Sequence, residues 1–221
     1  MTKIKLTRDD NYESVTKLIE KSLGTVQQDT FYSVLVHNAE IFYANNADEI
    51  VRALEDCRFK GLTQNIGVSC YEADEVTYIS SKYGSLNDFQ IPENVVDQRN
   101  LNNQNFRALH KSKKSLYIRS VFLQGSLLVE PTKLPRFFSP ELEVFYNFKE
   151  MCLENGVTNL KVCLDYTHSV DWKAGLVIGV QSSTQLDEIL KELSNPIKIK
   201  TFSNQTLSHL LVDPRKWNLN I

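Results

Sequence analysis

The sequence predicts an α/β fold in which buried parallel strands alternate with helices, and three features support this prediction. Short apolar stretches such as Phe31–Val36 have the continuous hydrophobicity of strands buried on both faces. Between these stretches, apolar residues recur at the spacing of an amphipathic helix. The stretches return after roughly 30 residues, the length of one strand–helix unit. Strands that alternate with helices pair in parallel through right-handed crossovers.

The first unit follows from its local signals. Residues 3–6 alternate between polar and apolar and predict a short strand. Asp10 and Glu13 have the spacing of a capping box, which predicts that a helix begins there. Gly24 predicts the end of that helix, because glycine is the common C-terminal cap. The strand at Phe31–Val36 then begins the second unit.

The later units repeat this order. Asn46 and Glu49 form a second predicted capping box, Gly61 ends the helix, and a strand over 65–69 follows. The remaining expected elements are a helix over 72–83, a strand around Phe89, a helix over 102–112, a strand over 115–121, a helix capped by Ser139-Pro140, a helix over 158–168, a strand over 175–180, a helix over 184–193 capped by Ser182 or Ser183, and a short helix around Leu207–Leu211.

About six such units predict an incomplete or distorted TIM-type (β/α) barrel that forms one domain over residues 1–221. A closed barrel needs eight strands in about 250 residues. Six units leave two sheet edges with unpaired backbone groups. We expect the chain to bury this gap by self-association as a homo-oligomer. The alternatives are a partner protein that supplies the missing strands, a smaller closed barrel, and a shortened gene product of limited stability.

Charge and hydropathy exclude two classes of partner. The formal net charge is −2, so the chain lacks the strongly basic character that is typical of nucleic-acid-binding proteins. The one positive run, residues 110–114, is expected to be the solvated end of a helix. No apolar run approaches the roughly 20 residues that a membrane helix needs. The first residues, MTKIKLTRDD, lack the apolar region of a signal peptide.

Cysteine usage predicts a reducing compartment and no metal. The chain has four cysteines, and none of them forms a C-x-x-C pair or a zinc-ligand spacing. Isolated cysteines without a secretion signal are typical of the cytoplasm, where we expect the protein to reside.

Polar residues stand where the predicted strands end. They are His37, Ser69, Gln90, Arg119 and Ser120. In a parallel barrel these ends meet at one mouth, where active sites are built. Each residue also has a purely structural interpretation: a histidine can bond a neighbouring carbonyl, and serine or glutamine can cap a strand. A charge such as Arg119 within an apolar strand is costly unless it is paired or lies at the mouth.

Ordered motifs at these positions resemble the aldo/keto reductase family. The motifs are LVHN ending at Asn38, Gly67-Val-Ser69, Gln90 followed by Asn94–Arg99, Arg119–Gly125, and Gly179 with Gln185-Leu186. The resemblance extends from Thr2 to Trp217, and the run RSVFLQG is similar to a bacterial subgroup associated with surface-polysaccharide genes. It implies reduction of a small carbonyl substrate by NADPH without a metal.

The resemblance assigns two catalytic residues. His37 matches the histidine that orients the carbonyl, and Lys3 matches the lysine that tunes the acid, although Lys5 competes for this place. The family uses a tyrosine as the acid, and a neighbouring cation is needed to lower its pKa from about 10. That tyrosine and its aspartate would lie before residue 1, since Tyr12 and Tyr32 are at other places. The chain is therefore expected to be inactive or weak alone.

For the nicotinamide half of the cofactor, the resemblance implies four residues. Ser69 and Gln90 match residues that bond the carboxamide, while Cys70 replaces an asparagine of the family. Arg119 stands where a tyrosine often stacks on the ring, and a guanidinium can also stack. Ser120 would face the pyrophosphate.

For the adenosine half, the resemblance implies Gln181, Ser182 and Gln185. Gln181 stands where a cation often pairs with the 2′-phosphate, so the preference for NADPH over NADH, or for any cofactor, is weakened. A helix that begins at Ser182 can still receive a phosphate through its free amides.

Three functions remain open from the sequence. The first is an impaired NAD(P)H-dependent oxidoreductase, and the second is a non-catalytic nucleotide-binding or protein-interaction module derived from the same family. The third is a barrel that uses His37 for other chemistry. The substrate would be set by the loops 38–46 and 126–138 and by the tail 200–221.

Overall fold

The computed structural model describes residues 1–100, 103–104, 109, 114–197 and 207–217. The helix expected over 102–112 lies mostly outside the described residues. Contacts between Cα atoms divide the chain into two compact units. Unit 1 comprises residues 1–91 and 103–117, and unit 2 comprises residues 92–102 and 118–221.

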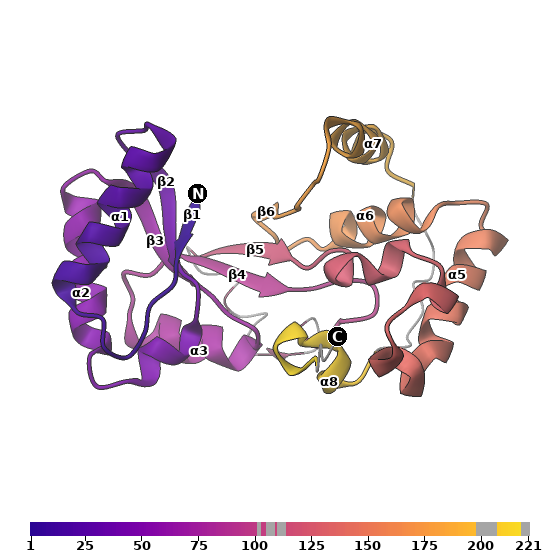
Figure 1. The fold of residues 1–221 in the computed structure, drawn as a ribbon, viewed down its shortest axis with the longest axis horizontal. Coiled ribbons are helices and arrows are strands. Elements are labelled where there is room, and N and C mark those ends of the chain that lie inside the picture. Colours follow the sequence, from indigo (N-terminus) through magenta and orange to yellow (C-terminus); the bar gives the residue numbers. More distant parts are fainter. Residues whose placement is uncertain (101–102, 105–108, 110–113, 198–206, 218–221) are drawn as a thin grey trace. The chain divides into compact units, whose positions relative to one another are not determined.

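One sheet of six parallel strands runs through the chain and does not close, so the predicted α/β class and incomplete barrel are confirmed. Its strands follow sequence order: β1 (Thr2–Ile4), β2 (Phe31–Val36), β3 (Thr63–Ser69), β4 (Asp88–Pro92), β5 (Ser115–Arg119) and β6 (Gly175–Leu176) (Figure 1). The last strand is shorter than the expected 175–180, because regular pairing with β5 is lost after the bond from Val177 N to Ile118 O.

Unit 1 begins with α1 (Tyr12–Val26), whose cap differs from the prediction. Asn11 is the cap and exchanges hydrogen bonds with Ser14, while the predicted Asp10 accepts bonds from Thr7 in the preceding turn. The helix also runs past Gly24 and ends at Gln27, which adopts the left-handed conformation with φ 53°. Hydrogen bonding inside the turn therefore decides where the helix begins.

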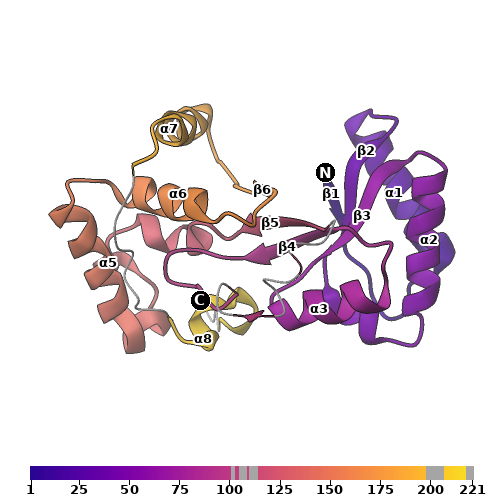
Figure 2. The same cartoon turned by 180° about the vertical axis from the view of Figure 1, so that it is seen from behind.

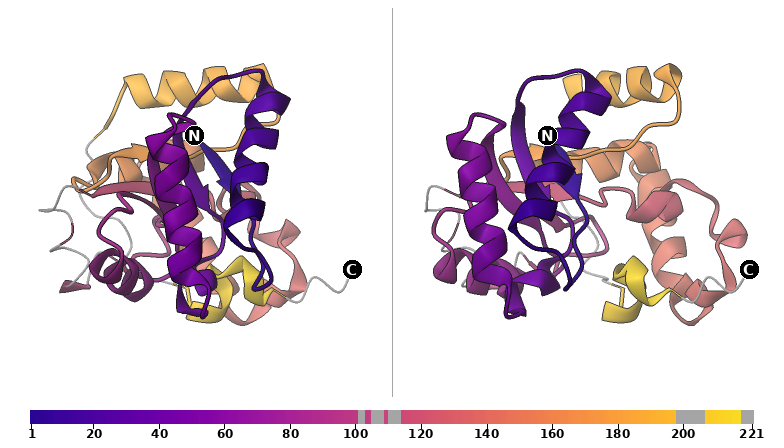
Figure 3. Two further views of the ribbon diagram at one scale, coloured as in Figure 1. Left: turned by 90° about the vertical axis from the view of Figure 1, so that its left-hand side faces the viewer. Right: turned by 60° about the vertical axis from the view of Figure 1, so that its left-hand side comes forward.

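The second helix, α2 (Ala47–Phe59), shows the same kind of deviation. Asn46 stands at the cap position, but its amide donates to the carbonyls of Arg8 and Asp10 and makes no side-chain cap bond. Gly61 ends the helix as predicted, with φ 77°. The third helix, α3 (Ala73–Lys82), agrees with the expected range within one residue at each end. Figure 3 shows α1 and α2 beside one another, next to the strands of unit 1.

Unit 2 contains α5 (Leu142–Glu154), α6 (Asn159–Ser169), α7 (Ser183–Ser194) and α8 (His209–Val212) (Figure 2). The predicted cap at Ser139-Pro140 is wrong, since Pro140 lies inside a 3-10 turn and α5 begins at Leu142. Ser182 caps α7 as predicted. α8 begins two residues later than the expected turn at Leu207.

The register of unit 1 separates two faces of the sheet. Ile4 pairs with Val36, and Val36 pairs with Val68, so these buried apolar residues share one face. The helices contribute equally buried stripes, such as Ile19 of α1 and Leu54 of α2, which pack on this face. Because side chains alternate along a strand, the neighbouring residues point to the opposite face, and that face carries the strand-end polar groups.

Candidate functional site

Three of the predicted site residues lie on neighbouring strand ends of unit 1. Ser69 pairs with Gln90 across β3 and β4. His37 follows Val36, whose partner on β3 is Val68, the residue before Ser69. The main-chain N–H of His37 donates to Ile4 O at 2.8 Å, which continues the parallel ladder. The register thus brings His37, Ser69 and Gln90 into one row.

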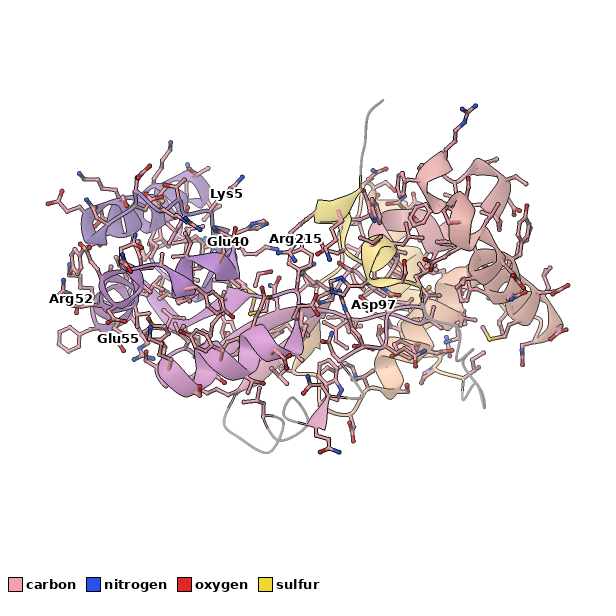
Figure 4. The ribbon with its side chains drawn as sticks, turned by 90° about the horizontal axis from the view of Figure 1, so that it is seen from below. Lys5, Glu40, Arg52, Glu55, Asp97 and Arg215 are labelled. Atoms are coloured by element: carbon pink, nitrogen blue, oxygen red, sulfur yellow. The ribbon has the colours of Figure 1, made fainter. Side chains whose placement is uncertain are left out.

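The two candidate lysines occupy different levels of β1. Lys3 pairs with Leu35, two residues before His37. Lys5 follows Ile4, the partner of Val36, and so stands level with His37. Both lysines are exposed. Figure 4 labels Lys5 together with Glu40, which comes from the turn that follows His37.

Gln90 is buried and has one unused hydrogen-bonding atom. Its side-chain N–H donates to the Met1 thioether, with 3.1 Å between Nε2 and Sδ. Its Oε1 makes no hydrogen bond within the described part of the chain, although the residue is only 2 % exposed. An unsatisfied buried acceptor costs free energy unless a donor reaches it. Gln90 Oε1 is therefore a buried acceptor without a donor among the described residues.

Gly67 allows β3 and β4 to approach closely beside Ser69. A Cβ at this position would lie 1.7 Å from Asp88 O and 2.9 Å from Leu35 Cδ2. Only glycine fits, and this is the physical role of the glycine in the Gly67-Val-Ser69 motif.

Arg119 and Ser120 lie together in unit 2, at the end of β5. A guanidinium N–H of Arg119 donates to Ser120 Oγ at 3.2 Å. Ser120 adopts the left-handed conformation with φ 59°, and its carbonyl accepts from the Asn94 amide at 3.0 Å. That bond holds the strained residue in place.

The segment after Ser120 continues with left-handed residues. Leu123, Gln124 and Gly125 have φ values of 44°, 55° and 88°. Two backbone N–H groups of this segment donate within the turn, from Leu123 to Ser120 O and from Gly125 to Phe122 O, both at 2.9 Å. These bonds hold the turn in shape and occupy the two N–H groups.

The remaining predicted residues come together at the start of α7. Ser182 Oγ accepts from Gln185 N at 3.2 Å, and Gln185 Oε1 accepts from Gln181 N at 2.8 Å. In this reciprocal cap, Oε1 of Gln185 is already used in a hydrogen bond within the chain. The side chain of Gln181 is exposed.

Sequence reasoning missed a buried acid in unit 2. Glu93 is fully buried and its Oε1 accepts a 2.6 Å hydrogen bond from the Tyr166 hydroxyl. Burial raises the pKa of Glu93 well above its ordinary value, and the nearby charge of Asp97 adds to the rise. The signal available in the sequence was an acidic residue directly after an apolar strand.

Among the described residues, no group of three or more histidine, cysteine, aspartate or glutamate side chains is placed so that it could hold a metal ion. Burial raises the pKa of the Cys152 thiol to about 11, which keeps it protonated. No helix among the described residues is long and apolar enough to cross a membrane.

Sequence and structure comparisons show which known proteins this chain is similar to. The sequence model of the aldo/keto reductase family matches residues 1–206. A solved structure of the aldo-keto reductase AKR11C1 from Bacillus halodurans, in its holo form, is similar with a TM-score of 0.75 and 16% identity. The match covers 96% of this chain and 74% of that one, and the apo form of the same protein gives a TM-score of 0.73 and 15% identity.

A second structure supports the same fold. The thermostable aldo-keto reductase Tm1743, solved with the inhibitor epalrestat, matches with a TM-score of 0.67 and 18% identity, covering 89% of this chain and 66% of that chain. A search of curated proteins gave no match.

Proposed function

The chain belongs to the aldo/keto reductase family, and on that premise we propose that it binds NAD(P)H and supports the reduction of a small carbonyl compound. The observation that carries this proposal is the row of His37, Ser69 and Gln90 on adjacent strand ends. In this row, a histidine that can donate to a carbonyl oxygen stands beside two groups that can hydrogen-bond an amide.

The residues of unit 1 fit the nicotinamide carboxamide. The amide group of that ring needs one acceptor and one donor, and Gln90 Oε1 is a buried acceptor without a partner among the described residues. The hydroxyl of Ser69 stands on the neighbouring strand and can donate. When bound, the cofactor would supply hydride. In unit 2, the residues that the resemblance implies for cofactor binding are Arg119, Ser120, Gln181, Ser182 and Gln185.

His37 and a lysine of β1 form the proposed catalytic pair. His37 would donate to the carbonyl oxygen and so stabilise the negative charge that develops there. Lys3 is the lysine that the resemblance assigns, while Lys5 is the one level with His37. The family's tyrosine and aspartate have no counterpart in residues 1–221, so we propose that the chain alone is inactive or weak.

A second candidate function is a non-catalytic nucleotide-binding or interaction module. The cap at α7 favours the interaction module, because Gln185 Oε1 is already hydrogen-bonded within the chain and Gln181 brings no cation to a 2′-phosphate. This cap also leaves the choice between NADPH and NADH open. The edges of the sheet, β1 and β6, are the proposed sites of homo-oligomer formation, and the cytoplasm is the proposed location.

Cofactor binding can be tested by titrating the chain with NADPH or NADH. The fluorescence of Trp172 and Trp217 reports the binding. We expect saturable binding that weakens at least tenfold in Gln90→Ala and stays unchanged in the exposed control Gln28→Ala. Absence of binding at millimolar cofactor would remove the reductase proposal.

Turnover separates the two candidate functions. Cofactor oxidation with generic aldehydes that falls sharply in His37→Ala supports a reductase. Binding without turnover in the unchanged chain supports the non-catalytic module.

A further inference from the structure

The last long helix of unit 2, α7, leaves part of its apolar stripe exposed. Leu186, Ile189, Leu190 and Leu193 have the spacing of one face of a helix. α7 packs on α6, yet Ile189 is the one residue of α7 that is buried. Leu186 and Leu190 are 43 % and 54 % exposed. An amphipathic helix normally buries such a stripe, so α7 lacks part of its packing partner.

The segment that leads into α7 lacks a partner too. Val177 N still bonds Ile118 O on β5, but the backbone groups of Ile178, Gly179 and Val180 make no backbone hydrogen bond within the described residues. Val180 is 42 % exposed, and a Cβ on Gly179 would have no atom within 4 Å. An apolar strand edge with unpaired backbone groups is a template for pairing with another chain.

The other edge of the sheet is less suited to such pairing. β1 has three residues, and the lysines in and directly after it, Lys3 and Lys5, are exposed. Short strands and exposed lysines are the features by which proteins prevent pairing at a sheet edge. The exposed apolar residues therefore favour the side of β6 and α7 as the place of contact.

The charges beside the exposed leucines of α7 complement themselves. Asp187 and Lys191 are exposed and lie one helical turn apart on the same flank of the stripe. In a contact about a two-fold axis, the same surface of each copy meets its counterpart in reverse order. With the axis near Ile189, Asp187 of each copy faces Lys191 of the other. A second copy brings the matching charge by symmetry, which favours it over an unrelated partner.

We propose that a second copy of this chain docks on this surface, called the α7 face and formed by residues 177–191. The two α7 helices pack antiparallel, with Leu186 and Leu190 at the apolar centre and the two charges at the rim. The same contact covers the unpaired segment 178–180. This proposal rests on the proposed homo-oligomer and narrows it from two sheet edges to one face.

Analytical ultracentrifugation of the full chain tests the dimer. We expect a mass that rises with concentration toward twice the 25.4 kDa of one chain. Leu190→Glu should raise the dissociation constant of the dimer by about tenfold or more, because both copies then bury a charge at the centre of the contact. Leu153→Glu is the matched control, since this leucine of α5 is 67 % exposed, and it should leave the dissociation constant unchanged.

Charge exchange tests the antiparallel arrangement. Asp187→Lys and Lys191→Asp each place like charges opposite one another, so each variant alone should dimerise more weakly, by about threefold or more. A mixture of the two variants should form a heterodimer in which every facing pair of charges is opposite. The double variant should recover the original dissociation constant.

Hydrogen exchange tests the strand segment. The amides of Gly179 and Val180 make no hydrogen bond within the described residues. They should become protected as the dimer forms and lose this protection in Leu190→Glu. Exchange that stays equally fast in monomer and dimer would remove this segment from the interface.

Three results would overturn the α7 face. A monomer at every concentration would remove both this face and the homo-oligomer. A dimer that Leu190→Glu leaves unchanged would place the contact elsewhere and remove this face alone. Charge variants that do not recover when mixed would exclude the antiparallel arrangement. If Leu190→Glu does not fold, the mixture of the two exposed charge variants decides. Cofactor titration of the same samples is a separate measurement, so it distinguishes failure of the dimer from failure of the reductase proposal.

Discussion

The hydroxyl of Tyr166 donates a 2.6 Å hydrogen bond to Oε1 of Glu93, and both side chains are buried in unit 2. Glu93 follows β4 directly, and Tyr166 belongs to α6, so the bond ties this helix to the end of a strand. The other carboxyl oxygen, Oε2, makes no hydrogen bond within the described residues. Burial raises the pKa of Glu93 well above its ordinary value and so favours the protonated form.

This burial predicts a pH-dependent stability. The folded pKa of Glu93 lies well above its value of about 4.5 in an unfolded chain. Between the two values the folded state holds a proton that the unfolded state releases, so the free energy of unfolding falls as pH rises. Urea unfolding from pH 4.5 to pH 8 should show this slope. Glu93→Gln should reduce it, while Glu13→Gln, on an exposed face, should leave it unchanged. An unaltered slope in Glu93→Gln would assign the effect to another group.

Removing the hydroxyl of Tyr166 should destabilise the fold. Tyr166→Phe removes one of the donors to the buried Glu93, which costs about 1–3 kcal/mol of unfolding free energy. Tyr146→Phe changes the same atom on an exposed tyrosine of α5 and should cost less than about 0.5 kcal/mol. Denaturant unfolding at fixed pH measures both. Equal effects in the two variants would contradict the importance of this bond.

Gly67 should tolerate no side chain. A Cβ in Gly67→Ala would collide with the Asp88 carbonyl on β4, which must move away and weaken the ladder beside Ser69. We expect a loss of about 1–3 kcal/mol or more in the free energy of unfolding. Gly84→Ala is the matched control, since a Cβ there has no atom within 4 Å. Similar stabilities of the two variants would show that β3 and β4 separate at little cost.

The ion pair between Lys161 and Asp165 in α6 should be costly to break. The two side chains are 8 % and 4 % exposed, with 2.8 Å between Nζ and Oδ1, and Lys161 also donates to Glu192 O in α7. Lys161→Met leaves a buried charge and should cost about 3–5 kcal/mol.

Two further variants define that cost. Lys161→Met combined with Asp165→Leu should recover much of the stability, because the buried charge is removed as well. Lys17→Met breaks the exposed pair with Glu13 and should change stability by less than about 0.5 kcal/mol. A double variant no more stable than the single one would show that the bond to Glu192 O matters more than the pair.

The strand ends were predictable because a strand buried on both faces is a continuous apolar run in the sequence. His37, Ser69, Gln90 and Arg119 each end or follow an apolar run, and the structure places each at or near the end of a parallel strand. Helix starts were less predictable. Asn46 has the right spacing for a cap, but its side-chain amide donates to the carbonyl of Asp10, 36 residues earlier. This long-range bond competes with capping and cannot be predicted from the neighbouring sequence.

The sequence by itself determined the order of strands and helices and the polar row at the strand ends, because both depend on hydrophobic period and residue type over a few positions. The tertiary structure alone decided which polar groups are buried and what they bond. Asp88 and Glu93 are ordinary acids in the printed sequence. Burial raises the pKa of both carboxyl groups, and Glu93 is hydrogen-bonded by Tyr166, which lies 73 positions later in the chain.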